Sequence, residues 1–321
     1  MEINTVAILG GSGFIGRNIC QLLAAEGYRA RVATRDRERA KEQLILLPTV
    51  DVIELDVHDP QALREFVRGS EAVINVVGVL HDGRGTGSFQ AAHVELARKV
   101  VAACRERGVR RLLHMSALNA APDGPSRYLR SKGEAENIVR SSGLEATLFR
   151  PSVVFGREDT FLNLFAQLLR FSPFVVLACP GARFQPVYVE DVAAAFVRSL
   201  TDPASIGRSY DLCGPGVYTL RELVEFVGVA TGRRRPVIGL NDTLSYWQAF
   251  AMELLPVKLL TRDNYHSMKA DSVCDCAFPF GIAPVALEAV APSYLAQNTP
   301  RSRYQRLRGR AGRNDSVNRE S

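Results

Sequence analysis

Three side chains in the middle of the sequence have the types and the spacing of an acid–base site. Tyr128 and Lys132 are one helical turn apart, so on a helix they share a face. A nearby ammonium favours the phenolate, and we therefore expect Lys132 to lower the pKa of Tyr128 toward neutral pH. Such a tyrosine can exchange a proton with a carbonyl or carbinol oxygen. Ser116 could orient the same oxygen. The alternative is that Tyr128 and Lys132 are an exposed pair on a helix without a catalytic role.

A glycine-rich turn near the start of the chain predicts a nucleotide site. Val6–Leu9 is a short apolar run typical of a buried strand, and Phe14–Ala25 has helical spacing. Between them, Gly10 allows a tight turn, Gly13 allows a pyrophosphate to approach the backbone, and Gly16 allows the helix to pack on the strand. The free N–H groups of the helix then favour phosphate. The alternative is a tight turn without a ligand.

The residue that follows the second predicted strand indicates which dinucleotide binds. Residues 30–34 form this strand, and Arg35 and Asp36 come directly after it. A site for NAD places an acid here to bind the ribose hydroxyls, whereas a planar and always charged arginine suits a 2′-phosphate. We therefore expect NADP(H), with NAD(H) as the alternative because of Asp36.

The remaining strands are predicted from short apolar runs. These runs alternate with stretches of helical spacing, for example residues 90–107 and 130–142. The further predicted strands are residues 52–55, 72–77, 111–115 and 145–149. This alternation is typical of an α/β fold, a Rossmann-type doubly wound parallel sheet, which binds ligands at the carboxyl ends of its strands. Asp56 and Gly78 fall at such ends. The residues expected to bind the cofactor are Gly10, Gly13, Phe14, Ile15, Gly16, Arg35, Asp56, Val57, Gly78 and Lys132.

The regular alternation stops after Arg150, which predicts three parts. Residues 1–150 are expected to form the dinucleotide-binding core, and residues 151–296 a smaller mixed lobe, interleaved with the core, that shapes the substrate pocket. Residues 297–321 read as a basic, disordered tail. Aromatic and aliphatic residues between Ser245 and Leu260 have roughly helical spacing. They predict a core or lid helix, or else a surface for a hydrophobic substrate or a partner subunit.

The distribution of charge argues against nucleic acid as a partner. The net charge is +6, but the last 25 residues carry seven arginines against Asp315 and Glu320, which leaves the body of the chain near neutral. The tail could touch RNA, anionic lipid or an acidic partner, or simply be solvated. Neither an N-terminal targeting signal nor an apolar run of about 20 residues is present. We expect a cytoplasmic protein that reaches a membrane only through a partner.

Six cysteines, at positions 20, 104, 179, 213, 274 and 276, lie mostly in apolar elements. Cys274 and Cys276 are the one close pair, and no second pair or nearby histidine completes a zinc site. We therefore expect reduced thiols and no metal centre.

Together these motifs resemble the short-chain dehydrogenase/reductase superfamily in its extended or atypical form. The blocks at residues 113–120, 126–132, 150–156, 183–193 and 260–263 are similar to one subgroup, related to the NAD(P)H-binding accessory subunit of respiratory complex I. The resemblance covers roughly residues 4–295. It implies that the three glycines bind the pyrophosphate and Arg35 the adenosine phosphate, and that Tyr128 and Lys132 contact the nicotinamide ribose.

Two functions are consistent with this resemblance. The first is an NADP(H)-dependent oxidoreductase or epimerase that uses Ser116, Tyr128 and Lys132 on a small, hydrophobic substrate such as a quinone. The second is a nucleotide-binding structural or assembly protein of a respiratory or quinone-biosynthesis complex, in which the cofactor only stabilises the fold.

Overall fold

A parallel seven-stranded sheet lies at the centre of the computed structural model, which describes residues 3–255 and 259–296. The strand order is β11-β6-β5-β4-β1-β2-β3, which confirms the predicted Rossmann-type α/β fold. The strands are β1 Thr5–Leu9, β2 Arg29–Thr34, β3 Val50–Glu54, β4 Ala72–Asn75, β5 Arg111–Met115, β6 Glu145–Pro151 and β11 Ser209–Leu212. The predicted basic tail, residues 297–321, lies outside the described residues.

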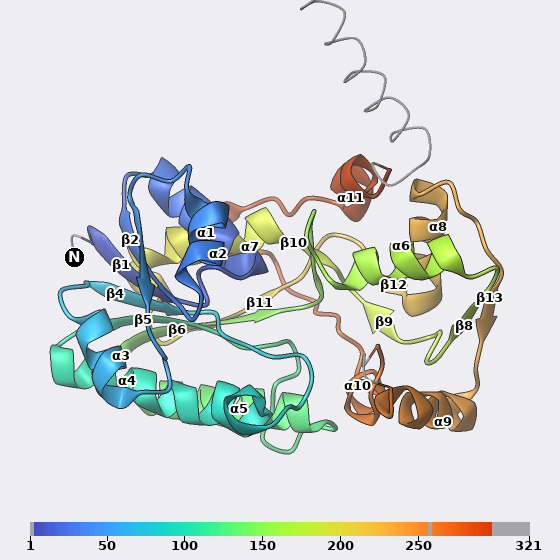
Figure 1. Ribbon diagram of the computed structural model, residues 1–321, viewed down its shortest axis with the longest axis horizontal. Helices are drawn as coiled ribbons and strands as arrows, with labels where there is room; N and C mark the ends of the chain where they lie inside the picture. The colour runs from blue at the N-terminus through green and yellow to red at the C-terminus, as the bar shows by residue number, and fades with distance from the viewer. Residues whose placement is uncertain (1–2, 256–258, 297–321) are drawn as a thin grey trace, which may run out of the picture.

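Helices cover both faces of the sheet (Figure 1). One face carries α1 (Phe14–Ala25), α2 (Arg37–Leu44) and α7 (Val189–Leu200), and the other carries α3 (Pro60–Val67), α4 (Leu96–Arg107) and α5 (Arg127–Arg140). Successive residues of a strand point to opposite faces. Ile8 is therefore buried in the core under α1 and α7, whereas Leu9 is buried in the core under α3 and α4. This two-sided burial explains why the strands read as continuous apolar runs.

A second lobe, on the right in Figure 1, has a core of its own around Phe155, Leu162 and Leu223. Its helix α8 begins with the predicted capping box, in which Thr219 and Glu222 bond each other's backbone N–H groups. Its helices are α6 Phe161–Phe171, α8 Leu220–Ala230, α9 Asp242–Glu253, α10 Arg262–Ser267 and α11 Leu287–Leu295. The short strands are β7 Val154–Phe155, β8 Val175–Leu177, β9 Arg183–Phe184, β10 Val187–Tyr188, β12 Tyr218–Thr219 and β13 Val237–Gly239.

Between elements of the second lobe, the chain returns to the main sheet and adds a helix and a strand to it. Helix α7 packs against α1, and β11 pairs in parallel with β6 as the edge strand of the main sheet. Short 3-10 turns at Gly85–Gly87, Pro203–Ser205 and Pro279–Gly281 join other elements. Within the described ranges, none of the helices has the length and apolar character needed to span a bilayer.

Candidate active site

The glycine turn has the shape that a pyrophosphate requires. Gly10 has a φ of +82°, and a Cβ there would lie 3.1 Å from the backbone of Val76 and Val77 after β4. Gly13 precedes α1, and no described side chain caps that helix. The first N–H groups of α1, at Phe14 and Ile15, therefore face the turn as donors for an anion. The turn fits a bound pyrophosphate.

Gly16 allows α1 to approach the turn, and its replacement tests the whole arrangement. A Cβ at Gly16 would lie 2.6 Å from the Cα of Gly11, closer than any relaxed contact. Gly16→Ala is therefore expected to destabilise the protein by about 1–3 kcal/mol and to abolish NADPH binding. Thermal unfolding and a fluorescence titration with NADPH measure the two effects. Gly181→Ala is the control, because nothing lies within 4 Å of a Cβ there; equal behaviour of the two variants would contradict the assignment.

At the end of β2, the structure separates the roles of Arg35 and Asp36. The carboxylate of Asp36 caps α2 by accepting the N–H of Arg39 at 3.0 Å. Arg35 is exposed at the carboxyl end of the strand. Asp36, the acid that supported NAD(H) as the alternative, thus bonds its own helix, while the Arg35 guanidinium faces solvent.

Positive charge is also present near the carboxyl end of β3, the strand next to β2. Asp56 accepts the N–H of His58 at 2.9 Å, and Val57, half-buried, lies between them. Burial lowers the pKa of His58, and the charges of Lys99 and Arg35 lower it further, although Asp56 opposes them. Two cations therefore lie close to His58 at the edge where the sequence places the adenosine.

Lys132 lies buried between the ends of β4 and β5. Its ammonium donates to the carbonyl oxygen of Met115 at 3.2 Å, and only 4% of the residue is exposed. A Cβ at Gly78 would lie 3.3 Å from the same nitrogen, so the absence of a side chain at Gly78 leaves room beside Lys132. Burial lowers the pKa of Lys132 to about 8, and Glu136 opposes that shift.

The structure contradicts the predicted direction of the Tyr128 pKa. Burial raises the pKa of Tyr128 to about 12, whereas the spacing of Tyr128 and Lys132 predicts a lowered pKa. The ammonium of Lys132 bonds to Met115, and the phenol ring packs at 5.7 Å from the Phe89 ring and 5.6 Å from the His93 ring. Desolvation therefore outweighs the expected charge effect. Tyr128 remains protonated at neutral pH, which suits a proton donor.

Ser116 follows β5 and is only 2% exposed, yet among the described residues its hydroxyl has no hydrogen-bond partner. A buried hydroxyl without a partner costs free energy unless something bonds it. Its position directly after Met115, whose carbonyl binds Lys132, brings the predicted serine and lysine to one place. Ser116 is thus ready to donate to a ligand oxygen.

His93 belongs to the site although its sequence position gave no ligand pattern. It lies in a π-helical turn, Gln90–Glu95, a feature often found at functional sites. Its Nε2 accepts the N–H of Val79 at 3.2 Å, and its Nδ1 donates to the hydroxyl of Ser131 at 2.8 Å, which in turn donates to the carbonyl of Tyr128. The one signal in the sequence that pointed to His93 was its position as a polar residue within an apolar helical run. The network holds the loop after β4 against α5.

Two neutral histidines make the fold sensitive to acid. Burial lowers the pKa of His93 to about 2 and that of His114 to about 3, and Lys132 lowers both further. Unfolded histidines bind protons near pH 6.5, so below that pH the unfolded state binds more protons. Stability should fall by up to about 1.4 kcal/mol per histidine per pH unit. Urea unfolding between pH 7 and 5 measures the slope. His93→Gln should reduce it and the exposed His266→Gln should not; equal slopes would contradict the burial argument.

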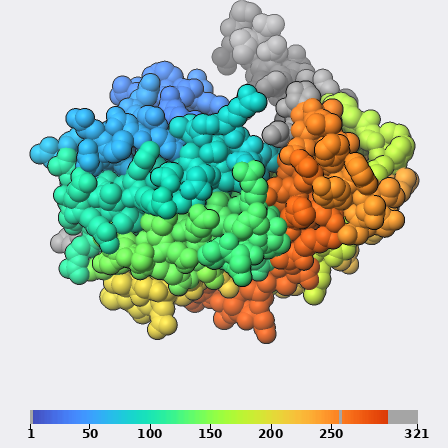
Figure 2. Space-filling view, turned by 90° about the horizontal axis from the view of Figure 1, so that it is seen from below, coloured from blue at the N-terminus to red at the C-terminus, as the bar shows by residue number. Residues whose placement is uncertain are grey.

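A cavity of about 340 Å³ opens between the lobes next to Phe89. It lies between α5, α9 and α10, and Figure 2 shows the orange surface of the second lobe directly beside the green surface of the first. Its acids have partners, since Asp82 pairs with Arg127 at 2.7 Å and Glu253 pairs with Arg262 at 2.8 Å. The other lining residues include Pro125, Arg130, Tyr246, Thr261, Asp263 and His266.

Asp263 connects this lobe to the helix that carries Tyr128. Its carboxylate accepts the N–H of Arg127 at 2.7 Å and the N–H of Tyr128 at 3.1 Å, while Ser126 caps the same helix from its own chain segment. The sequence showed Asp263 within a family-like block, but nothing in its spacing indicated this contact.

Comparison with known proteins agrees with this geometry. Residues 6–213 match the NAD dependent epimerase/dehydratase family, and the chain belongs to that family. The resemblance to extended short-chain dehydrogenases is thereby confirmed.

Its relatives include both a respiratory subunit and enzymes. The mitochondrial NADH dehydrogenase [ubiquinone] 1 alpha subcomplex subunit 9 of Arabidopsis thaliana is 36% identical over 226 residues, 68% of this chain but only 56% of that protein. This chain thus spans little more than half of that relative. A ceramide reductase of Caulobacter vibrioides is 32% identical over 239 residues, 74% of each chain.

Among solved structures, an NADPH-dependent quinone oxidoreductase of Escherichia coli with bound NADPH superposes with a TM-score of 0.73, over 90% of this chain and 99% of that one. At 20% identity this similarity shows a shared fold.

Proposed function

We propose that this protein is an NADP(H)-dependent oxidoreductase that reduces the carbonyl group of an apolar substrate. The observation that carries the proposal is the buried hydroxyl of Ser116, which has no partner among the described residues and directly follows Met115, whose carbonyl accepts the buried ammonium of Lys132. Both occur at the carboxyl edge of the sheet, where this fold binds its ligands. The apolar class of substrate is inferred from the names of two similar proteins, a ceramide reductase and a quinone oxidoreductase.

Each residue then has a distinct role. Ser116 donates a hydrogen bond to the carbonyl oxygen, Tyr128 gives that oxygen its proton, and Lys132 holds the ribose hydroxyls of the cofactor. Bound NADPH supplies the hydride. Burial raises the pKa of Tyr128 to about 12, and the protonated phenol is the form that reduction of a carbonyl requires.

The preference for NADP(H) over NAD(H) is part of the proposal. Arg35 faces solvent at the end of β2, whereas Asp36 caps α2. A guanidinium binds phosphate through paired, charge-assisted hydrogen bonds.

The test is consumption of NADPH by the purified protein with a ubiquinone analogue, a long-chain ketone and a nucleotide sugar. We expect turnover with one of the two apolar substrates and none with the nucleotide sugar. Ser116→Ala should slow that turnover by about 10–100-fold while the protein still binds NADPH. The absence of turnover with all three substrates, or a Ser116→Ala variant that is as fast as the parent, would contradict the proposal.

Asp263 is expected to act as a positioning residue for this reaction. Asp263→Ala removes two bonds to the start of α5 and should cost about 1 kcal/mol of stability. The turnover number should fall while the NADPH affinity stays near the parent value, because the glycine turn is untouched. Asp263→Asn keeps one acceptor and should restore part of the rate. The control is Asp123→Ala, at an exposed loop position; an unchanged turnover number in Asp263→Ala contradicts the positioning role.

A second candidate is a nucleotide-binding subunit of a membrane complex. The observation that favours it is an exposed apolar stripe formed by Leu244 and Trp247 on α9 and by Leu254, the residue directly after that helix. The relation to a respiratory subunit agrees with it. Comigration of the protein with a respiratory complex on native gels, lost in Trp247→Ser, together with NADP(H) that no substrate oxidises, would favour this role. A cytoplasmic location with peripheral membrane contact remains a prediction in either case.

A further inference from the structure

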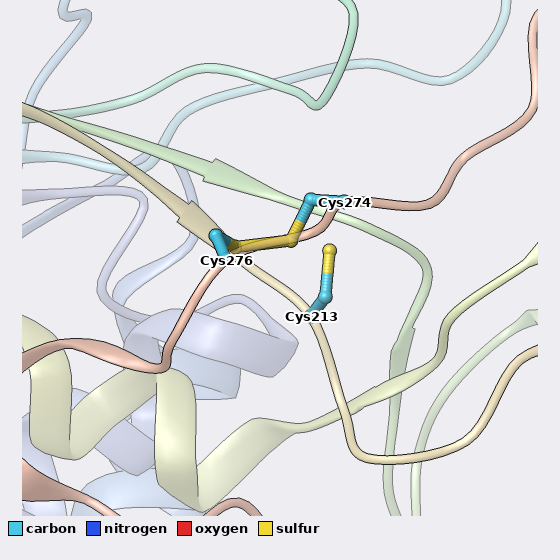
Figure 3. Close-up of side chains that lie close together, drawn as sticks. All are labelled: Cys213, Cys274 and Cys276. Atoms are coloured by element: carbon cyan, nitrogen blue, oxygen red, sulfur yellow. A yellow bond between two sulfur atoms is a disulfide. The ribbon is translucent and has the colours of Figure 1, made fainter.

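Three cysteine side chains meet at one edge of the main sheet. Cys213 follows β11, and Cys274 and Cys276 lie on a segment without regular secondary structure that crosses it (Figure 3). The structure joins Cys274 and Cys276 in a disulfide, and the three sulfur atoms lie within 4.8 Å of one another. The prediction of reduced thiols throughout is wrong for this pair, because the two Cα atoms lie 5.5 Å apart, within the range that a disulfide spans.

Contacts that do not involve sulfur hold these segments together. The side-chain amide of Gln185 accepts the N–H of Cys274 at 2.9 Å and donates to the carbonyl of Gly214 at 2.7 Å. Gln185 thus connects the residue after Cys213 with the segment of the other two cysteines. The three sulfur atoms should remain neighbours when the disulfide is reduced.

Exposure differs among the three residues in a way that permits entry of an ion. Cys213 is buried and its sulfur points toward the disulfide, whereas Cys276 is exposed (Figure 3). A tetrahedral ion with metal–sulfur bonds of about 2.3 Å holds its sulfur ligands about 3.8 Å apart. The Cys213 sulfur already lies within 4.8 Å of the other two, and the sulfur atoms of Cys274 and Cys276 separate to this distance once their disulfide is reduced.

We propose that in the reduced protein Cys213, Cys274 and Cys276 form a binding site for one soft d10 metal ion, Zn²⁺ or Cu⁺. Thiolates select these ions over hard cations. A dithiol reductant supplies the two electrons and two protons that convert the disulfide to two thiols and is itself oxidised to a disulfide. Each thiol that then binds the ion releases its proton to solvent. The proposed site shares no residue with Ser116, Tyr128 and Lys132, and its binding of an ion does not depend on the proposed reaction.

The test is an anaerobic titration of the full-length, dithiol-reduced protein after removal of the reductant. Cd²⁺, as a probe for zinc-type sites, should give a thiolate-to-metal charge-transfer band that saturates at one ion per chain. Competition with a chromophoric chelator for Zn²⁺ and another for Cu⁺ then distinguishes the two ions. The oxidised protein should bind neither.

Matched variants locate the site. Cys213→Ser and Cys276→Ser should lose the band, and Gln185→Ala should weaken binding by about tenfold or more. Cys104→Ser is the control, because Cys104 is a buried free thiol in α4. Should Cys213→Ser fail to fold, the exposed Cys276→Ser still reports, as does protection of Cys276 from alkylation by the bound ion. Absence of binding to the reduced parent, or equal binding by Cys104→Ser and Cys276→Ser, would overturn the proposal.

Discussion

Tyr128→Phe is expected to lower the turnover number for the carbonyl substrate by about 100-fold or more, with little change in NADPH affinity. The substitution removes the hydroxyl that we propose as the proton donor and keeps the ring that packs on Phe89 and His93. Since burial raises the pKa of Tyr128 to about 12, the phenol of the parent protein should remain protonated throughout the physiological range. Stopped-flow measurement of NADPH oxidation gives the rate of the chemical step.

The control for this prediction is Tyr28→Phe. Tyr28 is partly buried beside β2, at the opposite edge of the sheet from Ser116. Ser116→Ala and Tyr128→Phe act on the same substrate oxygen, so the double variant should lose less than the product of the two single losses. A Tyr128→Phe protein that turns over at the parent rate would remove the proposed mechanism, although NADPH binding could persist.

Arg35→Ala is expected to weaken NADPH binding by about 10–100-fold and to leave NADH binding nearly unchanged. The magnitude corresponds to the loss of hydrogen bonds to a charged group, worth about 1.5–3 kcal/mol. NADH has no 2′-phosphate and so loses nothing. Asp36 does not compensate, because its carboxylate caps α2. Fluorescence titrations with both nucleotides, at one ionic strength, measure the two affinities.

Arg37→Ala supplies the matched control, since Arg37 is also exposed and lies two residues further along the chain. It should lower NADPH affinity only slightly, through the general potential of the basic edge. If the parent binds NADH more tightly than NADPH, or if Arg37→Ala and Arg35→Ala have equal effects, the assignment of Arg35 to the 2′-phosphate is wrong.

The framework could be predicted because its signals are local in the chain. The strand, turn and helix around Gly10 and Gly16 depend on residues within one supersecondary unit, and so does the capping box at Thr219. Ser116 could be placed at the ligand-binding edge because it follows a parallel strand, and Lys132 could be placed near it because it lies on the next helix of the chain. The structure places the Lys132 ammonium on the carbonyl directly before Ser116.

Burial decided properties that residue types alone could not indicate. The spacing of Tyr128 and Lys132 predicts a lowered phenol pKa, but desolvation raises it. Arg150, after which the regular alternation stops, donates through its Nε to the buried carboxylate of Glu136 at 2.7 Å, a contact that the sequence did not indicate. The pKa of Tyr128 depends on the groups that exclude water around it, whereas the position of Arg150 depends on its ion pair with a carboxylate from another element.

The sequence by itself determined the sheet, the glycine turn and the identity of the three candidate catalytic residues, because periodicity and turn chemistry act over short stretches of chain. Only the tertiary structure decided that Asp263 caps the helix of Tyr128 and that Cys213 joins Cys274 and Cys276. These contacts connect segments far apart in the chain. Their partners are selected by the packing of the second lobe on the sheet, which no local pattern encodes.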